Sequence, residues 1–128
     1  MIYYIDTSAF LKLILEEAES SALTTSINLA RSQGNRIVSS ILLETELYRA
    51  MWRIEADRDL IAKELSKVTL ISASDTTFKH AGQFEEPYLR SLDALHLATA
   101  LEAEALGMYA YDKRLIDAAT QRGLRALL

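Results

Sequence analysis

The chain of 128 residues contains no cysteine, a single proline and only four glycines. The lack of cysteine excludes disulfides and thiolate metal sites, which fits a cytoplasmic protein. No apolar run reaches the ~20 residues that a membrane-spanning helix needs. No basic segment precedes the first apolar residues, so we expect no signal peptide. We therefore expect one globular domain over residues 1–128 that has no membrane partner.

Acidic residues outnumber basic ones, and the formal net charge is −4 at pH 7. A protein that coats nucleic acid non-specifically is normally basic, because lysine and arginine on phosphates supply its affinity. The charge therefore argues against that class. It is compatible with an enzyme that holds nucleic acid through a metal ion and a few local cationic side chains.

Short apolar segments alternate with longer segments of helical composition along the whole chain. Strands are predicted at 2–5, 36–39, 68–71 and 108–111, with a last short strand within 124–128. Helices are predicted at 9–17, 20–31, 41–54, 57–67, 75–84, 92–106 and 113–121. Strands joined by helices of this length form a parallel sheet with helices on both faces. The predicted fold class is α/β, with a central, mostly parallel sheet of four to five strands.

The segment 92–106 is apolar nearly all the way round when it is projected as a helix. A helix of this kind lies at the centre of a domain. Its first turn carries Asp93, flanked in projection by Leu97 and Ala100. Burial of an unpartnered carboxylate costs several kcal/mol, whereas an aspartate near a helix N-terminus is ordinarily stabilised by the helix dipole. Asp93 alone does not decide between a functional and a structural role.

Two further aspartates follow predicted strands and precede predicted helices. Asp6 comes after the strand 2–5, and Asp112 after the strand 108–111. The carboxyl ends of parallel strands meet at one edge of a sheet, where ligands bind in open α/β folds. Each of these aspartates could equally be a helix cap or a turn residue.

A fourth acidic residue, Glu44, is predicted on the inward side of the helix 41–54. In helical projection it falls between Met51 and Tyr48, inside an apolar arc. The opposite side of this helix is predicted to face solvent, and it carries Thr45, Glu46, Arg49 and Arg53.

Helices that cover a parallel sheet begin at its carboxyl edge, so side chains from distant parts of the chain can meet there. Four carboxylates are predicted to do so: Asp6, Glu44, Asp93 and Asp112. Clustered carboxylates raise one another's pKa unless a cation compensates, and Mg²⁺ and Mn²⁺ prefer such oxygen ligands. A site of this kind supports hydrolysis of phosphate esters. His96 is predicted to be a core histidine and Asp117 a solvated residue, so neither is assigned to the site.

Four blocks of the sequence carry these residues. They are Tyr-Ile-Asp-Thr-Ser-Ala-Phe-Leu-Lys (4–12), Ser-Ser-Ile-Leu-Leu-Glu-Thr-Glu-Leu-Tyr-Arg-Ala (39–50), Leu-Arg-Ser-Leu-Asp-Ala-Leu-His-Leu-Ala-Thr-Ala (89–100) and Tyr-Asp-Lys-Arg-Leu (111–115). In this order and spacing they resemble the PIN domain and, within it, the VapC toxins of type II toxin–antitoxin systems. The resemblance runs over nearly the whole chain and implies a three-layer, PIN-like fold.

The resemblance implies an Mg²⁺- or Mn²⁺-dependent endoribonuclease, a hydrolase whose substrates include tRNA or rRNA. The acidic quartet of the family falls on Asp6, Glu44, Asp93 and Asp112, with Asp6 and Asp93 as direct metal ligands. Glu44 and Asp112 would complete the site directly or through water, and a carboxylate there would help to deprotonate the attacking water. The resemblance also implies a cognate VapB-like antitoxin whose C-terminal segment blocks this site. A homodimer, and a larger complex of toxin with antitoxin, are implied as well.

Four cationic residues flank the blocks and are candidate phosphate contacts, although each could be an ordinary surface charge: Lys12, Arg90, Lys113 and Arg114. One position departs from the family pattern. Many members carry Thr or Ser two residues before the last aspartate, where this chain has Ala110. No hydroxyl is therefore expected to assist the metal from that position, and Thr7 and Ser8 remain available.

The main alternative is a PIN-like module that binds RNA or protein without cutting it. Such a module has no reason to bring four carboxylates together. A phosphoacceptor domain of the receiver type would need an aspartate at the end of the strand 68–71, where Ser72-Ala73-Ser74 stands. A phosphatase of the haloacid dehalogenase type would need an aspartate two residues after Asp6, where Ser8 stands.

Overall fold

The computed structural model describes all 128 residues and contains five strands and seven helices. The strands are β1 (Ile2–Ile5), β2 (Arg36–Ser40), β3 (Thr69–Ile71), β4 (Gly107–Tyr109) and β5 (Arg125–Ala126). The helices are α1 (Thr7–Ile14), α2 (Ser20–Ser32), α3 (Leu42–Met51), α4 (Arg58–Leu65), α5 (Asp75–Ala81), α6 (Ser91–Glu102) and α7 (Lys113–Gln121). The predicted order of strands and helices is confirmed. Five predicted helices end earlier than expected: α1 at Ile14, α3 at Met51, α4 at Leu65, α5 at Ala81 and α6 at Glu102. The turn after α6 places Glu104 at a positive φ of 56°, and the strand predicted at 108–111 ends at Tyr109.

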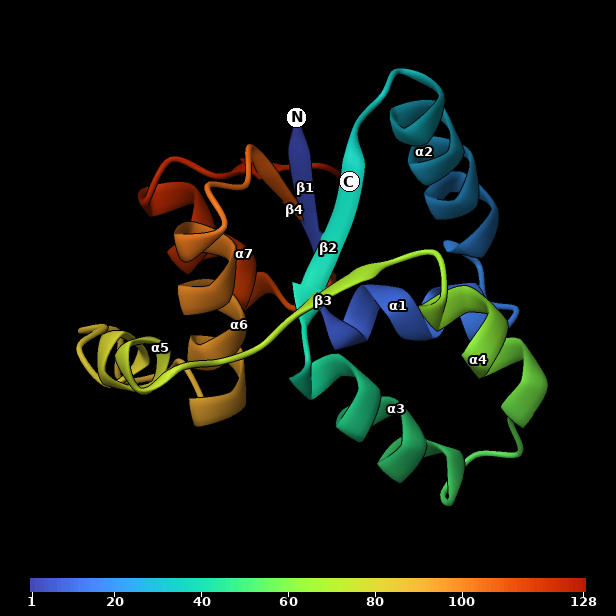
Figure 1. Ribbon diagram of the computed structural model, residues 1–128, viewed down its shortest axis with the longest axis horizontal. Helices are drawn as coiled ribbons and strands as arrows, with labels where there is room; N and C mark the ends of the chain where they lie inside the picture. Colours follow the sequence, from blue (N-terminus) through green and yellow to red (C-terminus); the bar gives the residue numbers. More distant parts are fainter.

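The five strands form one fully parallel sheet in the order β3-β2-β1-β4-β5. The chain moves outward from the central β1 to β2 and β3, then returns to place β4 on the other side of β1 (Figure 1). The order of strands therefore reverses between β1 and β4. The segments that leave these two strands lead to opposite faces of the sheet, which opens a crevice at their carboxyl ends.

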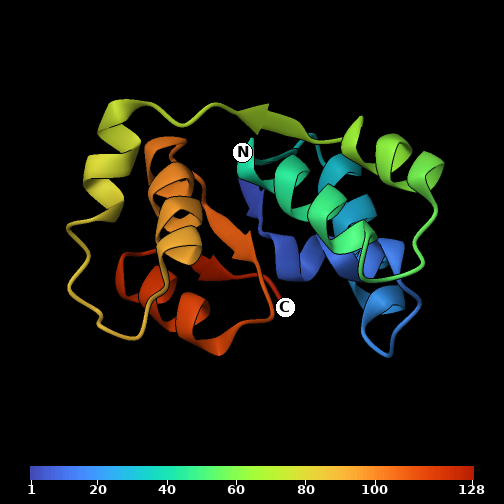
Figure 2. The same cartoon turned by 90° about the horizontal axis from the view of Figure 1, so that it is seen from below.

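Helices cover both faces of the sheet, which confirms the predicted three-layer α/β fold. One group, α1 to α4, lies on one side, and α6 and α7 lie on the other with α5 packed against α6 (Figure 2). Adjacent strand residues point to opposite layers, as the two-residue period of a strand requires. In β1, Tyr4 packs toward α6 and α7, while Ile5 packs toward α1 to α4.

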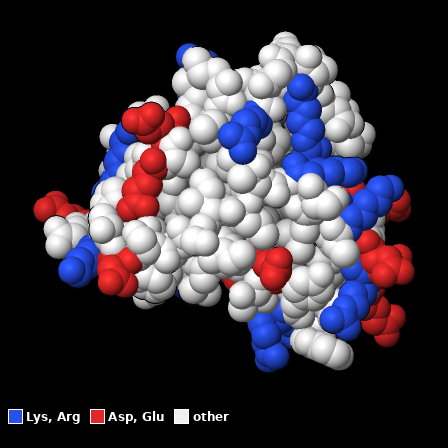
Figure 3. All heavy atoms as spheres, viewed as in Figure 1, with Lys and Arg blue, Asp and Glu red and all other residues white.

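The outer surface of these layers carries charges of both signs. On the face shown in Figure 3, acidic and basic side chains are interspersed toward the two ends of the molecule, and no continuous basic surface crosses it. None of the helices has the length and apolar character that a membrane crossing requires.

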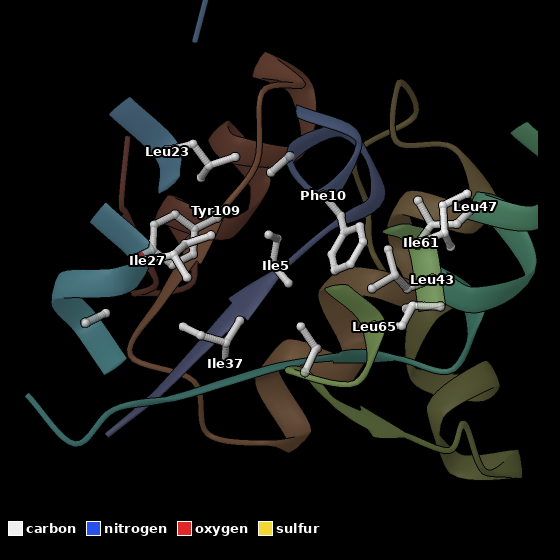
Figure 4. Close-up of a cluster of buried hydrophobic side chains, with 13 residues drawn as sticks. Ile5, Phe10, Leu23, Ile27, Ile37, Leu43, Leu47, Ile61, Leu65 and Tyr109 are labelled. Atoms are coloured by element: carbon white, nitrogen blue, oxygen red, sulfur yellow. The ribbon is translucent and has the colours of Figure 1, made fainter. Parts of the chain in front are cut away.

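The larger of two apolar clusters joins the sheet to α1 through α4 (Figure 4). Ile5 of β1 lies at its middle, with Phe10 of α1 beside it and Leu43 of α3 beyond. This packing sets the position of α3 against the carboxyl edge of the sheet. On the opposite face, α6 is buried from Ala94 to Ala100, as its apolar composition predicts.

Candidate functional site

A cleft of about 500 Å³ opens at the carboxyl edge of the sheet, at the crevice between β1 and β4. Residues from four separated segments line it. Its polar lining consists of Asp6, Thr7, Ser8, Thr45, Glu46, Arg49, Arg53, Asp93, His96 and Asp112. A larger groove of about 620 Å³ runs along α1 and α2, but its acidic residues are only the exposed Glu16 and Glu17. Each of the four sequence blocks contributes an acidic residue to the cleft and none to the larger groove, so the cleft is the candidate site.

Asp6 lies at the end of β1, where its carboxylate is buried and only 3% of the residue is exposed. It caps α1, because Oδ1 accepts a hydrogen bond of 2.9 Å from the Ala9 amide. The Ser8 hydroxyl lies 2.8 and 2.9 Å from the two carboxylate oxygens and itself accepts a bond from the Tyr111 amide. Burial, together with the charge of Asp93, raises the pKa of Asp6 to about 6 despite these hydrogen bonds. Asp6 is thus both a helix cap and a member of the cleft.

Asp112 combines the same two roles in the short connection from β4 to α7. Its Oδ1 accepts hydrogen bonds from the amides of Arg114 and Leu115 and so caps α7. Its side chain also lines the cleft. The structural and functional interpretations of Asp6 and Asp112, which the sequence leaves as alternatives, are therefore compatible at both positions.

Asp93 approaches this pair from the first turn of α6 and is half-buried. Burial raises the pKa of Asp93, and the charges of Asp112 and Glu46 raise it further, against the opposing effects of His96 and Arg90. The carboxylates of the cleft therefore interact unfavourably with one another. Such a cluster attracts a cation.

The structure does not bring Glu44 into the cleft, and the prediction that it points inward is wrong. Glu44 is exposed and is absent from the cleft lining. Glu46, predicted to be solvated, stands there instead, with 24% of its side chain exposed. Burial raises the pKa of Glu46, but the hydrogen bonds from its partners His96 and Thr7 help to outweigh this effect, and the pKa is lowered overall.

The error has a definite physical source. The predicted apolar arc includes Met51, Tyr48 and Ile54, which pull its centre toward Glu44. The fully buried positions of α3 are only Leu43, Leu47 and Ala50. At about 100° per residue, the centre of that face lies nearer to Glu46 than to Glu44. The spacing of Glu46, three residues after Leu43 and four before Ala50, is the signal that the sequence offers.

His96 is a buried histidine, as predicted, but it also reaches the cleft. Its Nε2 lies 2.7 Å from Oε1 of Glu46, and its Nδ1 lies 2.5 Å from the Tyr4 hydroxyl. The Thr7 hydroxyl donates a bond of 2.8 Å to the same Glu46 oxygen. Burial strongly raises the pKa of Tyr4, so its phenol stays protonated. The hydroxyls of Thr7 and Ser8 thus hold Glu46 and Asp6, whereas Ala110 lies buried in the core.

The cations that line the cleft differ from the predicted ones. Arg49 and Arg53 line the cleft, and neither forms an ion pair with a carboxylate of the chain. By contrast, Lys12 pairs with Glu17 and Glu19, and Lys113 pairs with Asp117 at 3.0 Å. The exposed Arg90 and Arg114 do not line the cleft either. Asp117 also stays outside it, as predicted.

The donors of the cleft fit a hard divalent cation held in an incomplete protein site. No group of three or more His, Cys, Asp or Glu side chains is arranged to hold one ion. Mg²⁺, however, is commonly bound by one or two carboxylates together with waters and substrate phosphates. Asp6 and Asp93 offer such a pair, and their raised pKa values reflect burial and negative charge that a cation would compensate.

Comparison with known proteins identifies the class to which this fold and site belong. The family model described as "PIN domain" matches residues 3–121, so the chain belongs to the PIN domain family. It is 35% identical over 121 residues to ribonuclease VapC35 of Mycobacterium tuberculosis. The aligned region covers 91% of this chain and 88% of that protein. The resemblance to PIN domains of the VapC type is thereby confirmed.

Two solved structures share the fold at lower identity. The M. tuberculosis toxin VapC20, described as cleaving the sarcin–ricin loop, matches with a TM-score of 0.72 and 16% identity over 96% of both chains. A chain of VapBC2 from Rickettsia felis, bound to a DNA fragment from its promoter, matches with a TM-score of 0.72 and 16% identity. That match covers 92% of this chain and 95% of the other.

Proposed function

We propose that this chain, as one PIN domain over residues 1–128, is the toxin of a type II toxin–antitoxin system of the VapBC kind and an Mg²⁺- or Mn²⁺-dependent endoribonuclease. The observation that carries the proposal is the meeting of four carboxylates from four separated segments in one cleft at the strand-order reversal. These residues are Asp6, Glu46, Asp93 and Asp112. The ribonuclease names of relatives such as VapC35 support the same activity.

Asp6 and Asp93 hold the divalent cation, because each is a buried or half-buried carboxylate of the cleft and each has a pKa that burial raises. Asp112 and Glu46 complete the site directly or through water. The cation supplies Lewis acidity toward the scissile phosphate and its attacking water. The protein fixes the carboxylates in advance, since Asp6 and Asp112 are each locked by backbone amides at a helix N-terminus.

Glu46 accepts the proton of the attacking water. Its pKa is lowered, so it is ionised at neutral pH and ready to act as a base. Arg49 and Arg53 face the same cleft without ion-pair partners and bind the phosphates on either side of the cleaved bond. The RNA is therefore held by local arginines and a metal, which is consistent with the acidic net charge.

The partner of this toxin is a VapB-like antitoxin. The fold match to a chain of a VapBC complex supports this assignment. We also expect the toxin to form a homodimer and to enter a larger assembly with the antitoxin. Its substrate class is structured RNA such as tRNA or rRNA.

The test is cleavage of total RNA by the purified, antitoxin-free protein in Mg²⁺, in Mn²⁺ and in EDTA. Asp93→Asn should abolish cleavage, because it removes a charge that holds the cation while preserving the size of the side chain. Asp117→Asn is the matched control, since this aspartate is paired with Lys113 outside the cleft. We expect discrete metal-dependent cuts by the wild type and by the control only.

Equal cutting by wild type and Asp93→Asn would contradict the assigned site. No cutting by folded wild type in either metal, on RNA that it binds, would favour a non-catalytic RNA-binding module instead.

A further inference from the structure

A histidine lies within the continuously buried part of α6. His96 is 1% exposed, and every other α6 residue from Ala94 to Ala100 is buried as well. Both ring nitrogens of a buried histidine need hydrogen-bond partners, because an unsatisfied polar group in the core is costly. Tyr4 contacts Nδ1 of His96, and Glu46 contacts Nε2, which also lies 3.2 Å from the Thr7 hydroxyl. The imidazole thus connects β1 to α3 through α6.

The hydrogen bonds determine which ring nitrogen carries the proton. The Tyr4 hydroxyl accepts a bond of 3.0 Å from the Ser40 amide, so its own proton is free to be donated to Nδ1 of His96, 2.5 Å away. A phenol has a single proton to give. The ionised carboxylate of Glu46 can only accept, so the ring proton lies on Nε2, which donates to Oε1 at 2.7 Å, and in the neutral ring Nδ1 accepts the Tyr4 proton.

The two oxygens of Glu46 are consequently not equivalent. Oε1 accepts from His96 Nε2 and also from the Thr7 hydroxyl at 2.8 Å, which uses both of its lone pairs. Oε2 makes no hydrogen bond within the protein and is not sealed off from solvent. One carboxylate oxygen is anchored by the core, and the other is left for the cleft.

We propose that His96 is a positioning residue, locked by Tyr4 in its Nε2–H tautomer, which anchors Oε1 of Glu46 so that Oε2 alone serves the metal and its water. This inference rests on the proposed function for the role of Glu46, but the tautomer and the anchoring are properties of the metal-free protein. Residues that orient a ligand in this way commonly change metal affinity or activity by about 10–100-fold when they are replaced.

The tautomer can be measured directly by long-range ¹H–¹⁵N correlation of the imidazole in metal-free protein at neutral pH. The chain has two histidines, so His80→Gln leaves the signal of His96 alone. We expect a neutral ring with the proton on Nε2, and a mixture of tautomers in Tyr4→Phe. A proton on Nδ1, or the same spectrum in Tyr4→Phe, would overturn the proposal.

The anchoring is tested by Mn²⁺ binding, measured calorimetrically without RNA, and by RNA cleavage. His96→Leu should weaken both by about 10–100-fold, whereas His96→Gln, whose amide can still donate from near the Nε2 position, should recover most of the loss. Thr99→Val is the control, because Thr99 is equally buried on α6 and its hydroxyl bonds only to Leu95 of the same helix. Should His96→Leu prove unfolded, Tyr4→Phe carries the same test.

The outcomes separate the two proposals. Normal Mn²⁺ binding and cleavage in a folded His96→Leu or Tyr4→Phe protein would overturn the positioning role while leaving the ribonuclease intact. An Nε2–H ring and Mn²⁺ binding that depends on His96, in a wild type that cuts no RNA, would overturn the ribonuclease while leaving the anchoring of Glu46 in place.

Discussion

The two flanks of α3 carry similar residues and have different surroundings. One flank faces the cleft with Thr45, Glu46 and Arg49. The other carries Glu44 and Tyr48, and Tyr48 lies under Arg58 of α4, with 5.8 Å from the guanidinium to the ring centre. Two glutamates separated by one intervening residue therefore differ in their contacts and in their exposure to solvent. Glu46 is tied to His96 and Thr7, whereas Glu44 is exposed.

This difference shows that the role a side chain can take depends on the residues that face it in the folded protein. Both glutamates lie at the margin of the buried face of α3. The packing of α3 on Phe10 and Ile61 turns one margin toward Asp6 and Asp93 and the other toward solvent. Paired substitutions, one inside the cleft and one outside it, test whether function follows this division.

The largest difference is expected between the two glutamates. Glu46→Gln should lower kcat for RNA cleavage by about 10²–10⁴-fold, the usual contribution of a general base, while keeping the shape of the side chain. Glu44→Gln should leave kcat and stability nearly unchanged, because exposed substitutions typically shift stability by less than about 0.5 kcal/mol. Single-turnover cleavage of one defined RNA measures the rate for both variants. A large decrease in Glu44→Gln with an active Glu46→Gln would reverse the assignment made from the structure.

Two helix-capping aspartates give the next comparison. Asp6 caps α1 from inside the cleft, and Asp57 caps α4 in solvent. Because burial raises the pKa of Asp6 to about 6, its ionisation costs stability in the metal-free protein. The unfolded chain loses this proton at a lower pH than the folded one. Stability should therefore fall as pH rises from about 4 to about 6, by roughly 3 kcal/mol, and stay level above that range.

Thermal unfolding in EDTA across this range checks the sign. Asp6→Asn keeps an acceptor for the Ala9 amide and should be more stable than wild type at neutral pH, with an advantage that shrinks as the pH falls. Mg²⁺ should stabilise the wild type and not the variant. Asp57→Asn keeps Asp6, so its stability should fall over this pH range as the wild type's does. A wild type that gains stability between pH 4 and 6 relative to Asp6→Asn would contradict the raised pKa.

The smallest effects are expected from the arginines. Arg49→Ala and Arg53→Ala should weaken RNA binding and lower the slope of log affinity against log salt concentration by about 0.7 for each phosphate that is no longer neutralised. Arg58→Ala, on the other flank of α3, should leave the slope unchanged. Binding by the uncleaving Asp93→Asn protein at several salt concentrations measures this. Equal slopes for all three variants would place the RNA elsewhere on the surface.

Local pattern was enough to predict most of the fold and three of the four acidic residues now assigned to the cleft. The alternation of short apolar strands with helices determines a parallel sheet. Asp6 follows β1 directly and Asp112 comes shortly after β4, so chain direction alone puts both at the carboxyl edge of the sheet. Asp93 could be placed because α6 is apolar on every side and its first turn must start at that same edge.

Only the tertiary structure decided which glutamate joins them, which partners His96 finds and which arginines line the cleft. Helical periodicity states how a side chain points relative to its own helix axis, but not what stands on each side of that helix. Glu44 and Glu46 occupy opposite margins of one buried face, and the apolar spacing of α3 is compatible with either margin facing the sheet edge. The choice is made by contacts between residues distant in sequence, such as Glu46 with Thr7 and His96, and no local pattern contains them.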